Sequence, residues 1–193
     1  MARRLVVLIS GNGSNLQAIL DACTANELNA AVVAVISNKR DAYGLERARQ
    51  AGIPAIARPR PLSQPREQYD TDLADLVASY APDFVVLAGW MRVLSNAFLS
   101  RFPGQVVNLH PALPGCFPGT DAIARAYDDH VTQGLRETGV MVHFVPDEGV
   151  DSGPLIAVEH VPILLDDTLD ALTARMHAVE HRLLVAALKL LTP

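Results

Sequence analysis

Short aliphatic runs alternate with amphipathic stretches along the first part of this chain. Residues 4–10 are almost continuously aliphatic, which indicates a strand covered on both faces. Residues 16–23 then place apolar side chains at i, i+3, i+4 and i+7, the spacing of one helical face. Residues 31–37, 44–50 and 53–57 repeat the pattern as a strand, a short helix and a strand. This β-α-β-α-β order restricts the chain to α/β folds, because parallel strands need long crossover connections.

The remaining segments extend the same architecture. We expect a long helix from residue 66, a strand at 83–88, a short helix near Phe98, a strand at 106–109, a helix at 120–128, a polar connection at 129–137, strands at 140–145 and 154–160, and a last helix capped by Asp167 or Thr168. No repeat or domain boundary interrupts the series. The sequence therefore predicts one domain over residues 1–193: a single Rossmann-like open, mostly parallel sheet with helices on both faces and an antiparallel pair near the end.

Charge and composition exclude several classes of function. Among 193 residues, 21 acidic side chains outnumber 16 basic ones, which argues against binding of a nucleic-acid backbone. Cys23 and Cys116 have no metal-ligand spacing. The apolar run at 84–91 is too short for a membrane helix, and Gly11 interrupts a start that imitates a signal peptide. We expect a cytoplasmic protein without a metal, a nucleic-acid partner or a membrane partner.

Three loops follow buried strands and should meet at the carboxyl edge of the sheet, where α/β proteins bind ligands. They span residues 11–15, 89–94 and 108–119. The first joins glycines to a helix start, which suits a small phosphate. It lacks both GxGxxG and Gly-Lys-Ser/Thr, so neither a dinucleotide nor a nucleoside triphosphate is favoured. The alternative is a plain tight turn with Ser14 as the helix cap.

Asn108 and His110 lie two residues apart at the end of a strand, so their side chains should share one face. An amide beside an imidazole suits a reaction in which an oxyanion develops. The alternative is that both residues only form a turn before Pro111. Asp151 lies in an acidic glycine-bearing loop, where most carboxylates are simply solvated. Next to His110 it would raise the pKa of the imidazole, but spacing alone does not predict that contact.

Four segments in order resemble the phosphoribosylglycinamide formyltransferases, a family of folate-dependent enzymes of purine (IMP) synthesis. The matching segments are 8–19, 86–94, 108–113 and the pair 142–144 with 150–154. The resemblance extends over about residues 5–190. It implies a formyltransferase fold, 10-formyltetrahydrofolate as formyl donor, and glycinamide ribonucleotide as acceptor.

The resemblance also implies roles for individual residues. Those implied to bind the ribonucleotide are Gly13, Ser14, Asn15 and Glu180. Those implied to contact the folate are Arg66, Met91, Arg92, Val93, Leu94 and Asn108. The implied catalytic residues are Asn108, His110 and Asp151.

The implied chemistry is direct transfer. The ribonucleotide amine attacks the formyl carbon and gives a tetrahedral intermediate, to whose oxygen Asn108 and protonated His110 would donate. Asp151 would keep His110 charged and, through water, help to move the proton from the amine to the leaving nitrogen. We expect small-molecule partners only, no metal, and a monomer or homodimer.

Some positions depart from the family's pattern. Cys116 and Asp121 stand where lysine and histidine are common, and Trp90 replaces a frequent phenylalanine. We expect His143 to be a core residue or one that supports a site from behind, and the other histidines to lie at the surface, with His181 beside Glu180 at the border of the site.

Two competing interpretations remain. Another formyl-handling enzyme, a methionyl-tRNA formyltransferase or a formyltetrahydrofolate hydrolase, would resemble a longer chain with an added domain. A non-catalytic α/β module could bind a nucleotide or a protein through the same edge of the sheet.

Overall fold

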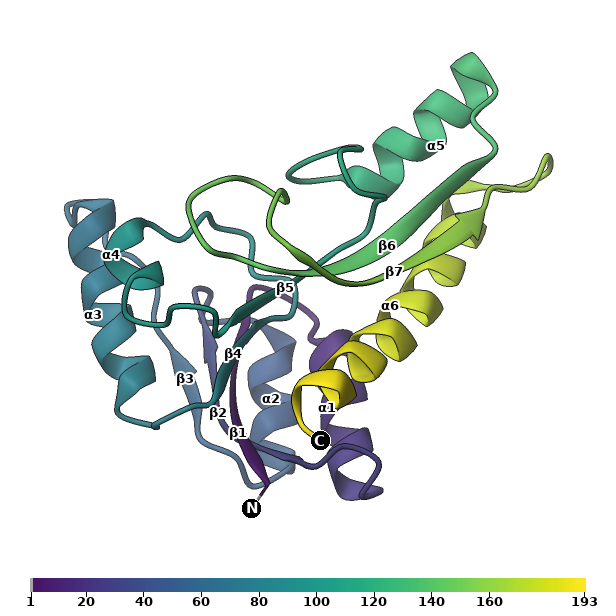
Figure 1. The fold of residues 1–193 in the computed structure, drawn as a ribbon. Helices are drawn as coiled ribbons and strands as arrows, with labels where there is room; N and C mark the ends of the chain where they lie inside the picture. Colours follow the sequence, from purple (N-terminus) through teal and green to yellow (C-terminus); the bar gives the residue numbers. More distant parts are fainter. Residues whose placement is uncertain (1) are drawn as a thin grey trace.

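The computed structural model describes residues 2–193 and shows an open seven-stranded sheet with helices on both faces (Figure 1). In chain order the elements are β1 (Arg3–Ile9), α1 (Ser14–Thr24), β2 (Ala30–Ser37), α2 (Tyr43–Gln50), β3 (Ala55–Ala57), α3 (Arg66–Ala78), β4 (Phe84–Leu87), α4 (Asn96–Leu99), β5 (Val106–His110), α5 (Ala122–Gln133), β6 (Glu137–Phe144), β7 (Leu155–Pro162) and α6 (Leu169–Leu191).

The strands are arranged in the order β3-β2-β1-β4-β5-β6-β7. The first five strands of this order, β3, β2, β1, β4 and β5, pair in parallel. At one edge, β6 pairs antiparallel with β5, and β7 pairs antiparallel with β6. The predicted fold class, an open and mostly parallel α/β sheet, is therefore confirmed.

Strand β1 shows why the first strands are aliphatic throughout. Leu5, Val7 and Ile9 belong to the core beneath α1, α2 and α6, whereas Val6 and Leu8 belong to the core beneath α3 and α4. Successive side chains of a strand point to opposite faces, so a strand between two helix layers must be apolar at every position. Figure 1 shows α3 and α4 on one side of the sheet and α1, α2 and α6 on the other.

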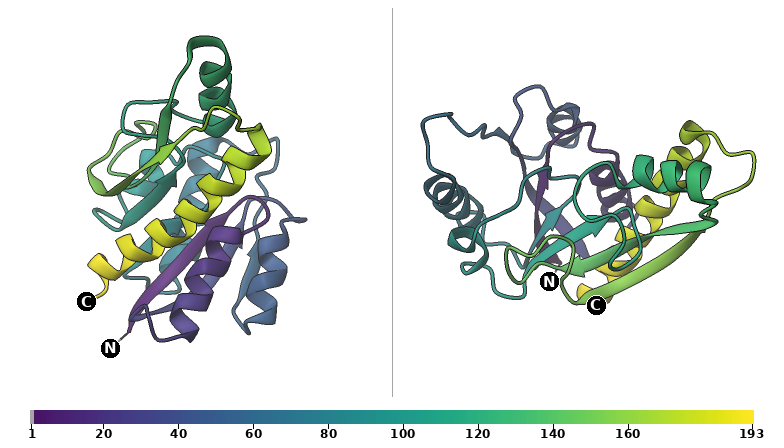
Figure 2. Two further views of the ribbon diagram at one scale, coloured as in Figure 1. Left: turned by 90° about the vertical axis from the view of Figure 1, so that its right-hand side faces the viewer. Right: turned by 90° about the horizontal axis from the view of Figure 1, so that it is seen from above.

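The last helix carries one of the predicted caps. The side-chain oxygen of Thr168 accepts a hydrogen bond from the Ala171 N–H, 3.2 Å away, whereas Asp167 binds Arg175 instead. Figure 2 shows α6 alongside α1, which brings residues near 180 to the beginning of the chain's first helix.

The boundaries of α5, β6 and β7 differ clearly from the sequence-based expectation. Helix α5 continues to Gln133, where a polar connection was expected, and stops at Gly134, whose φ of 74° ends the helix. Strand β6 begins at Glu137 and β7 extends to Pro162, because the two strands pair as far as Glu137 and Pro162. The start of β6 at Glu137 carries no apolar alternation, so only its pairing with β7 assigns it to the strand.

The carboxyl ends of β1, β4 and β5 lie at one edge of the sheet, since these strands are parallel neighbours. The three loops that the sequence singled out therefore start at a common edge. Within residues 2–193, no helix is both long and apolar enough to span a bilayer.

Candidate active site

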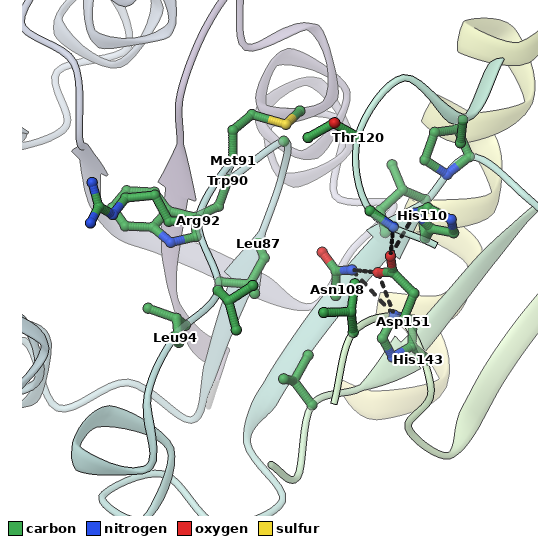
Figure 3. A pocket seen from close by; sticks show the side chains of 18 of the residues that line it. Leu87, Trp90, Met91, Arg92, Leu94, Asn108, His110, Thr120, His143 and Asp151 are labelled. Atoms are coloured by element: carbon green, nitrogen blue, oxygen red, sulfur yellow. Dashed lines mark hydrogen bonds and ion pairs between the residues drawn. The ribbon is translucent and has the colours of Figure 1, made fainter. Parts of the chain in front are cut away.

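A cavity of about 500 Å³ opens at this edge of the sheet (Figure 3). Residues within 87–94, 108–111, 119–122 and 143–151 line it. In Figure 3, Leu87, Trp90 and Leu94 form one side, and Asn108, His110, His143 and Asp151 gather on the other. The cavity therefore has an apolar wall facing a cluster of polar and titratable groups.

Strand β5 supplies Asn108 and His110. The two side chains share a face because they are two residues apart on a strand, as predicted. His110 is only 3% exposed, and its Nδ1 lies 3.2 Å from Oδ2 of Asp151. The side-chain nitrogen of Asn108 donates to Oδ1 of the same carboxylate at 3.0 Å. The structure thus brings Asn108, His110 and Asp151 together, although 40 residues lie between His110 and Asp151 in the sequence.

Asp151 lies in the loop between β6 and β7 and has a φ of 52°, in the left-handed region. Its Oδ2 also accepts a hydrogen bond from the Gly119 N–H at 2.8 Å. Burial alone would raise the pKa of this carboxyl, but the nearby His143 ring, the hydrogen bond from the Gly119 N–H and the neighbouring His110 ring lower the pKa below its ordinary value. Asp151 is therefore an ionised acceptor at neutral pH.

His110 differs from the expectation in its titration. Burial is the largest influence and lowers the pKa of the imidazole, while Asp151 and the carbonyl of Phe117 act in the opposite direction. Asp151 does act to raise the pKa as expected, but burial outweighs it, and the net pKa lies below the ordinary value. The physical reason is that a nearly buried imidazolium loses more hydration than one carboxylate restores.

The loop at residues 111–121 closes over His110. The carbonyl oxygen of Phe117 lies 3.0 Å from Nε2 of His110, and Phe117 itself has a φ of 46°. Gly119 from the same loop reaches Asp151. Both ring nitrogens of His110 therefore face acceptors, one a carboxylate and one a backbone carbonyl.

His143 is the residue whose place the sequence did not predict in detail. It is 1% exposed, it pairs with Asn108 across β5 and β6, and its Nε2 lies 3.2 Å from the Asn108 side-chain nitrogen. Its expected place in the core or behind a site agrees with this burial. The register of an antiparallel pair, which decides the contact, cannot be read from the residues of β6 alone.

The glycine loop lies next to the cavity but not in its wall. Gly13 has a φ of 76°, and a Cβ atom there would come within 2.7 Å of the Gly44 Cα, so only glycine fits. Gly13 also occupies the N-cap position of α1 without any side-chain cap, so the alternative in which Ser14 caps the helix is wrong. The first helical N–H groups, including those of Ser14 and Asn15, have no partner from a cap.

Side chains with ionisable groups lie on two sides of this helix start. The Arg47 guanidinium donates to the carbonyl oxygen and to the side-chain oxygen of Asn12, both at 2.9 Å. On the other side, Asn15 donates to Glu180 of α6 at 2.7 Å. Burial raises the pKa of the Glu180 carboxyl, against the opposing effects of Asn15 and His177. The four residues expected at the ribonucleotide site therefore do lie together, at the junction of α1 and α6.

The residues expected to contact folate divide into two groups. Met91, Arg92, Val93 and Leu94 line the cavity, and the Met91 N–H donates to Ser10 at 2.8 Å, which ties this segment to the end of β1. Arg66 is not part of the wall. Its guanidinium binds Glu148 at 2.9 Å, between the cavity-lining residues Asp147 and Gly149. Arg66 thus supports the loop that carries Asp151.

Comparison with known proteins identifies the family. Residues 3–188 match the family model described as formyl transferase. The chain is 49% identical to phosphoribosylglycinamide formyltransferase of Escherichia coli (strain K12), covering 92% of this chain and 81% of that protein. It is 43% identical to the Dictyostelium discoideum protein of the same name, covering 100% and 99%.

A solved structure agrees with these relatives. The crystal structure of glycinamide ribonucleotide transformylase 1 from Symbiobacterium toebii superposes with a TM-score of 0.92 at 42% identity, covering 98% of this chain and 87% of that one. The family match and the structural superposition both include the sheet, the cavity and the helix that carries Glu180. The chain therefore belongs to the formyl transferase family, among its phosphoribosylglycinamide formyltransferases.

Proposed function

We propose that this protein transfers the formyl group of 10-formyltetrahydrofolate to the amine of glycinamide ribonucleotide, as a step of purine biosynthesis. The observation that carries the proposal is the cluster of Asn108, His110 and Asp151 between an apolar cavity and a helix start suited to a phosphate. Sequence identity of 43–49% to formyltransferases over nearly the whole chain supports the same activity.

The cavity fits the flat, partly polar formyl donor. Trp90 lines the wall, and its Nε1 is buried without a hydrogen-bond partner within residues 2–193. Arg92, Val93 and Leu94 belong to neither helix nor strand, so their backbone groups are free of ladder bonds. Apolar walls with a few polar groups are typical of cofactor sites, and a volume of about 500 Å³ lies in their range. When bound, the folate supplies the formyl group.

The helix start of α1 suits the phosphate of the ribonucleotide. Backbone N–H groups at a helix N-terminus attract anions, and Arg47 adds a positive charge beside Asn12. Glu180 and Asn15 form the buried end of this region. A carboxyl with a raised pKa is suited to hydrogen bonding with sugar hydroxyls.

The reaction then places the two ligands on either side of the polar cluster. The lone pair of the neutral amine forms a C–N bond to the formyl carbon, and the carbonyl π electrons move to the formyl oxygen. When this pair returns, the bond from carbon to the donor nitrogen breaks, and that nitrogen receives the proton that the amine loses. Protonated His110 is placed to stabilise the negative oxygen, an effect worth about 3–4 kcal/mol for a well-placed donor.

The loop contact on His110 has a consequence for this step. His110 Nε2 faces the carbonyl of Phe117, so the formyl oxygen has to replace that carbonyl before it can receive the hydrogen bond. Asp151 holds Nδ1 on the other side of the ring and remains in place. As an ionised base, Asp151 also suits transfer of the amine proton, through water, to the leaving nitrogen.

Purified protein tests the proposal directly. We expect the N-formyl ribonucleotide to accumulate, detected by mass spectrometry, only when both substrates are present. Methionyl-tRNA should not be formylated, and 10-formyltetrahydrofolate should not be hydrolysed without the ribonucleotide. Absence of the formylated product would eliminate the proposed activity.

Two variants test the assigned roles. His110→Ala and Asp151→Asn should each lower kcat by about 10³-fold or more, because each removes a group that acts on the transition state. Binding of the ribonucleotide should change little, since its phosphate lies at α1. His160→Ala, at an exposed position of β7, is the matched control. Near-normal rates in either active-site variant reject the role assigned to that residue.

A further inference from the structure

The carboxamide of Asn108 is held by two acceptors. Its nitrogen lies 3.0 Å from Oδ1 of Asp151 and 3.2 Å from Nε2 of His143. An amide nitrogen carries two hydrogens, so this pair of contacts uses both. Figure 3 shows the amide oxygen on the opposite side, turned away from Asp151 and His143.

The ring of His143 can be assigned from its other nitrogen. Nδ1 lies 2.8 Å from the carbonyl oxygen of Phe144, and a carbonyl only accepts, so Nδ1 carries the hydrogen. In the neutral imidazole Nε2 is then an acceptor, and it lies 3.6 Å from Oδ1 of Asp151, which is too far for a hydrogen bond to that carboxylate. This makes the nitrogen of Asn108, rather than its oxygen, the group that faces His143.

Asp151 imposes the same orientation independently. Its carboxyl has a lowered pKa and is an acceptor at neutral pH. Reversal of the amide would place two oxygens 3.0 Å apart, with no hydrogen between them. His143 and Asp151 therefore hold the amide from two sides, and His143, which is 1% exposed, has no bulk water to replace it.

We propose that His143 is a positioning residue that, together with Asp151, keeps the Asn108 side-chain oxygen directed into the reaction cavity, where this oxygen accepts a hydrogen bond from the attacking amine of the substrate. The inference rests on the proposed formyl transfer and assigns Asn108 a different task from donation to the formyl oxygen. Donation would require Asn108 to release Asp151 or His143.

An acceptor at this position assists the step that forms the new bond. The amine has N–H groups to donate while its lone pair points at the formyl carbon. As the C–N bond forms, the nitrogen becomes positively charged, so its hydrogen bond to Asn108 strengthens in the transition state. The two residues of β5 thus stabilise opposite charges of the transition state: His110 donates to the developing negative oxygen, and Asn108 accepts from the developing positive nitrogen.

The loop contact supports this division. The partner of His110 Nε2 is a backbone carbonyl of a loop in which Phe117 and Asp121 both have positive φ values. One partner of Asn108 is the buried His143 side chain on β6, whose Nδ1 is held by the backbone carbonyl of Phe144 in the same strand. Exchange of a partner for substrate is therefore easier at His110 than at Asn108.

The first test determines the tautomer of His143 and does not require enzymatic turnover. In the protein labelled with ¹⁵N-histidine, long-range proton–nitrogen spectra should show Nδ1 of His143 protonated and its Nε2 unprotonated at neutral pH. The His143 signals are assigned by their loss in His143→Gln. A protonated Nε2 overturns the proposal, because that nitrogen would then donate, either to Asp151 or to a reversed Asn108 amide, and could not accept from the Asn108 nitrogen.

Ligand discrimination is the second test. Calorimetry in the absence of folate compares glycinamide ribonucleotide with its analogue in which hydrogen replaces the amine. Wild type should bind the amine-bearing ligand about tenfold more tightly, the effect of one hydrogen bond. Asn108→Leu and His143→Leu should lose this preference, whereas His143→Gln, which retains an acceptor, should keep most of it. His160→Leu on β7 is the control for replacing a histidine.

The outcomes separate this inference from the activity on which it rests. If the wild-type protein forms no product, the proposed function is wrong. The tautomer experiment then still shows how the Asn108 side chain is held. Turnover in wild type with an unchanged ligand preference in a folded His143→Leu, monitored by circular dichroism, overturns the positioning role. We expect kcat of His143→Leu to fall about tenfold and to recover in His143→Gln, with little change in KM for folate.

Discussion

His110 illustrates how burial and charge compete at a single residue. The ring is nearly buried, it faces the Asp151 carboxylate and the Phe117 carbonyl, and its pKa is nevertheless lowered. The folded protein therefore holds a neutral imidazole more readily than the unfolded chain does. A ligand that brings negative charge to this ring will raise its pKa again, so proton uptake should accompany formation of the reactive complex.

The lowered pKa predicts a pH effect on folding. Between the folded pKa and the ordinary value of 6.5, the unfolded chain binds more protons than the folded one. The contribution of His110 to stability is therefore present above pH 6.5 and is lost as the pH falls through this window. Urea unfolding of wild type and His110→Gln at several pH values should show a difference that changes there. A His110 titration by NMR with a midpoint above 6.5 contradicts the prediction.

Gly13 offers a second prediction at the scale of one residue. Its positive φ and the 2.7 Å approach of a Cβ atom to Gly44 both oppose a side chain. Gly13→Ala should lower the free energy of unfolding by about 2 kcal/mol or more, the sum of backbone strain and overpacking. Gly52 has a φ of 71° but open space, so Gly52→Ala should cost only about 1 kcal/mol. Equal losses measured by urea unfolding would show that contact with Gly44 contributes nothing.

At the scale of an element, the start of α6 is held by a short network. Arg175 donates to both oxygens of Asp167, at 2.6 and 2.8 Å, and to the carbonyl of Pro162. The Leu164 N–H also donates to Asp167. These bonds lower the pKa of the Asp167 carboxyl to about 2. The network fixes the connection between β7 and the helix that carries Glu180.

Asp167→Asn tests this network. Because the folded pKa is about 2 and the ordinary value is 3.8, the contribution of Asp167 is present above pH 3.8 and is lost as the pH falls toward 2. The variant should be less stable than wild type at neutral pH, and the difference in unfolding midpoint should shrink with acid. Thr168→Ala removes the neighbouring cap and should cost about 1 kcal/mol at any pH. A loss in Asp167→Asn that does not depend on pH would assign the effect to geometry instead.

At the scale of the whole molecule, two ligand regions share one edge of the sheet but use different elements. The cavity lies beyond β4 and β5, and the helix start lies beyond β1, with Asn108 and its neighbours between them. The bond from Met91 to Ser10 joins the two regions. Ligands at both regions should therefore bind together and stabilise the same folded unit.

Thermal unfolding measures this coupling. Each ligand at about a hundred times its Kd should add about 2.7 kcal/mol, which corresponds to a rise in Tm of roughly 5–10 °C for a domain of this size. Asn15→Ala should weaken only the response to the ribonucleotide, and Trp90→Ala only the response to a folate analogue. A variant that loses both responses would point to general damage to the fold.

Local patterns in the sequence determined most of the architecture of this protein. The strands beyond which ligands bind are short apolar runs, and the helices repeat apolar residues at helical spacing, so both depend on neighbours in the chain. The same local rule put Asn108 and His110 on one face. The start of β6 at Glu137 did not follow this rule, because a polar residue there joins the strand only through its pairing with β7.

Tertiary structure decided how the site is assembled. Asp151 reaches His110 only because the β6–β7 loop folds back over β5, and His143 meets Asn108 only through the register of two antiparallel strands. The direction of the His110 pKa likewise depends on how much of the ring is buried, a sum over residues distant in the chain. Chain-local patterns specify which elements form. Long-range packing specifies which acceptor faces which donor, and in this protein that choice turns the oxygen of Asn108 toward the cavity.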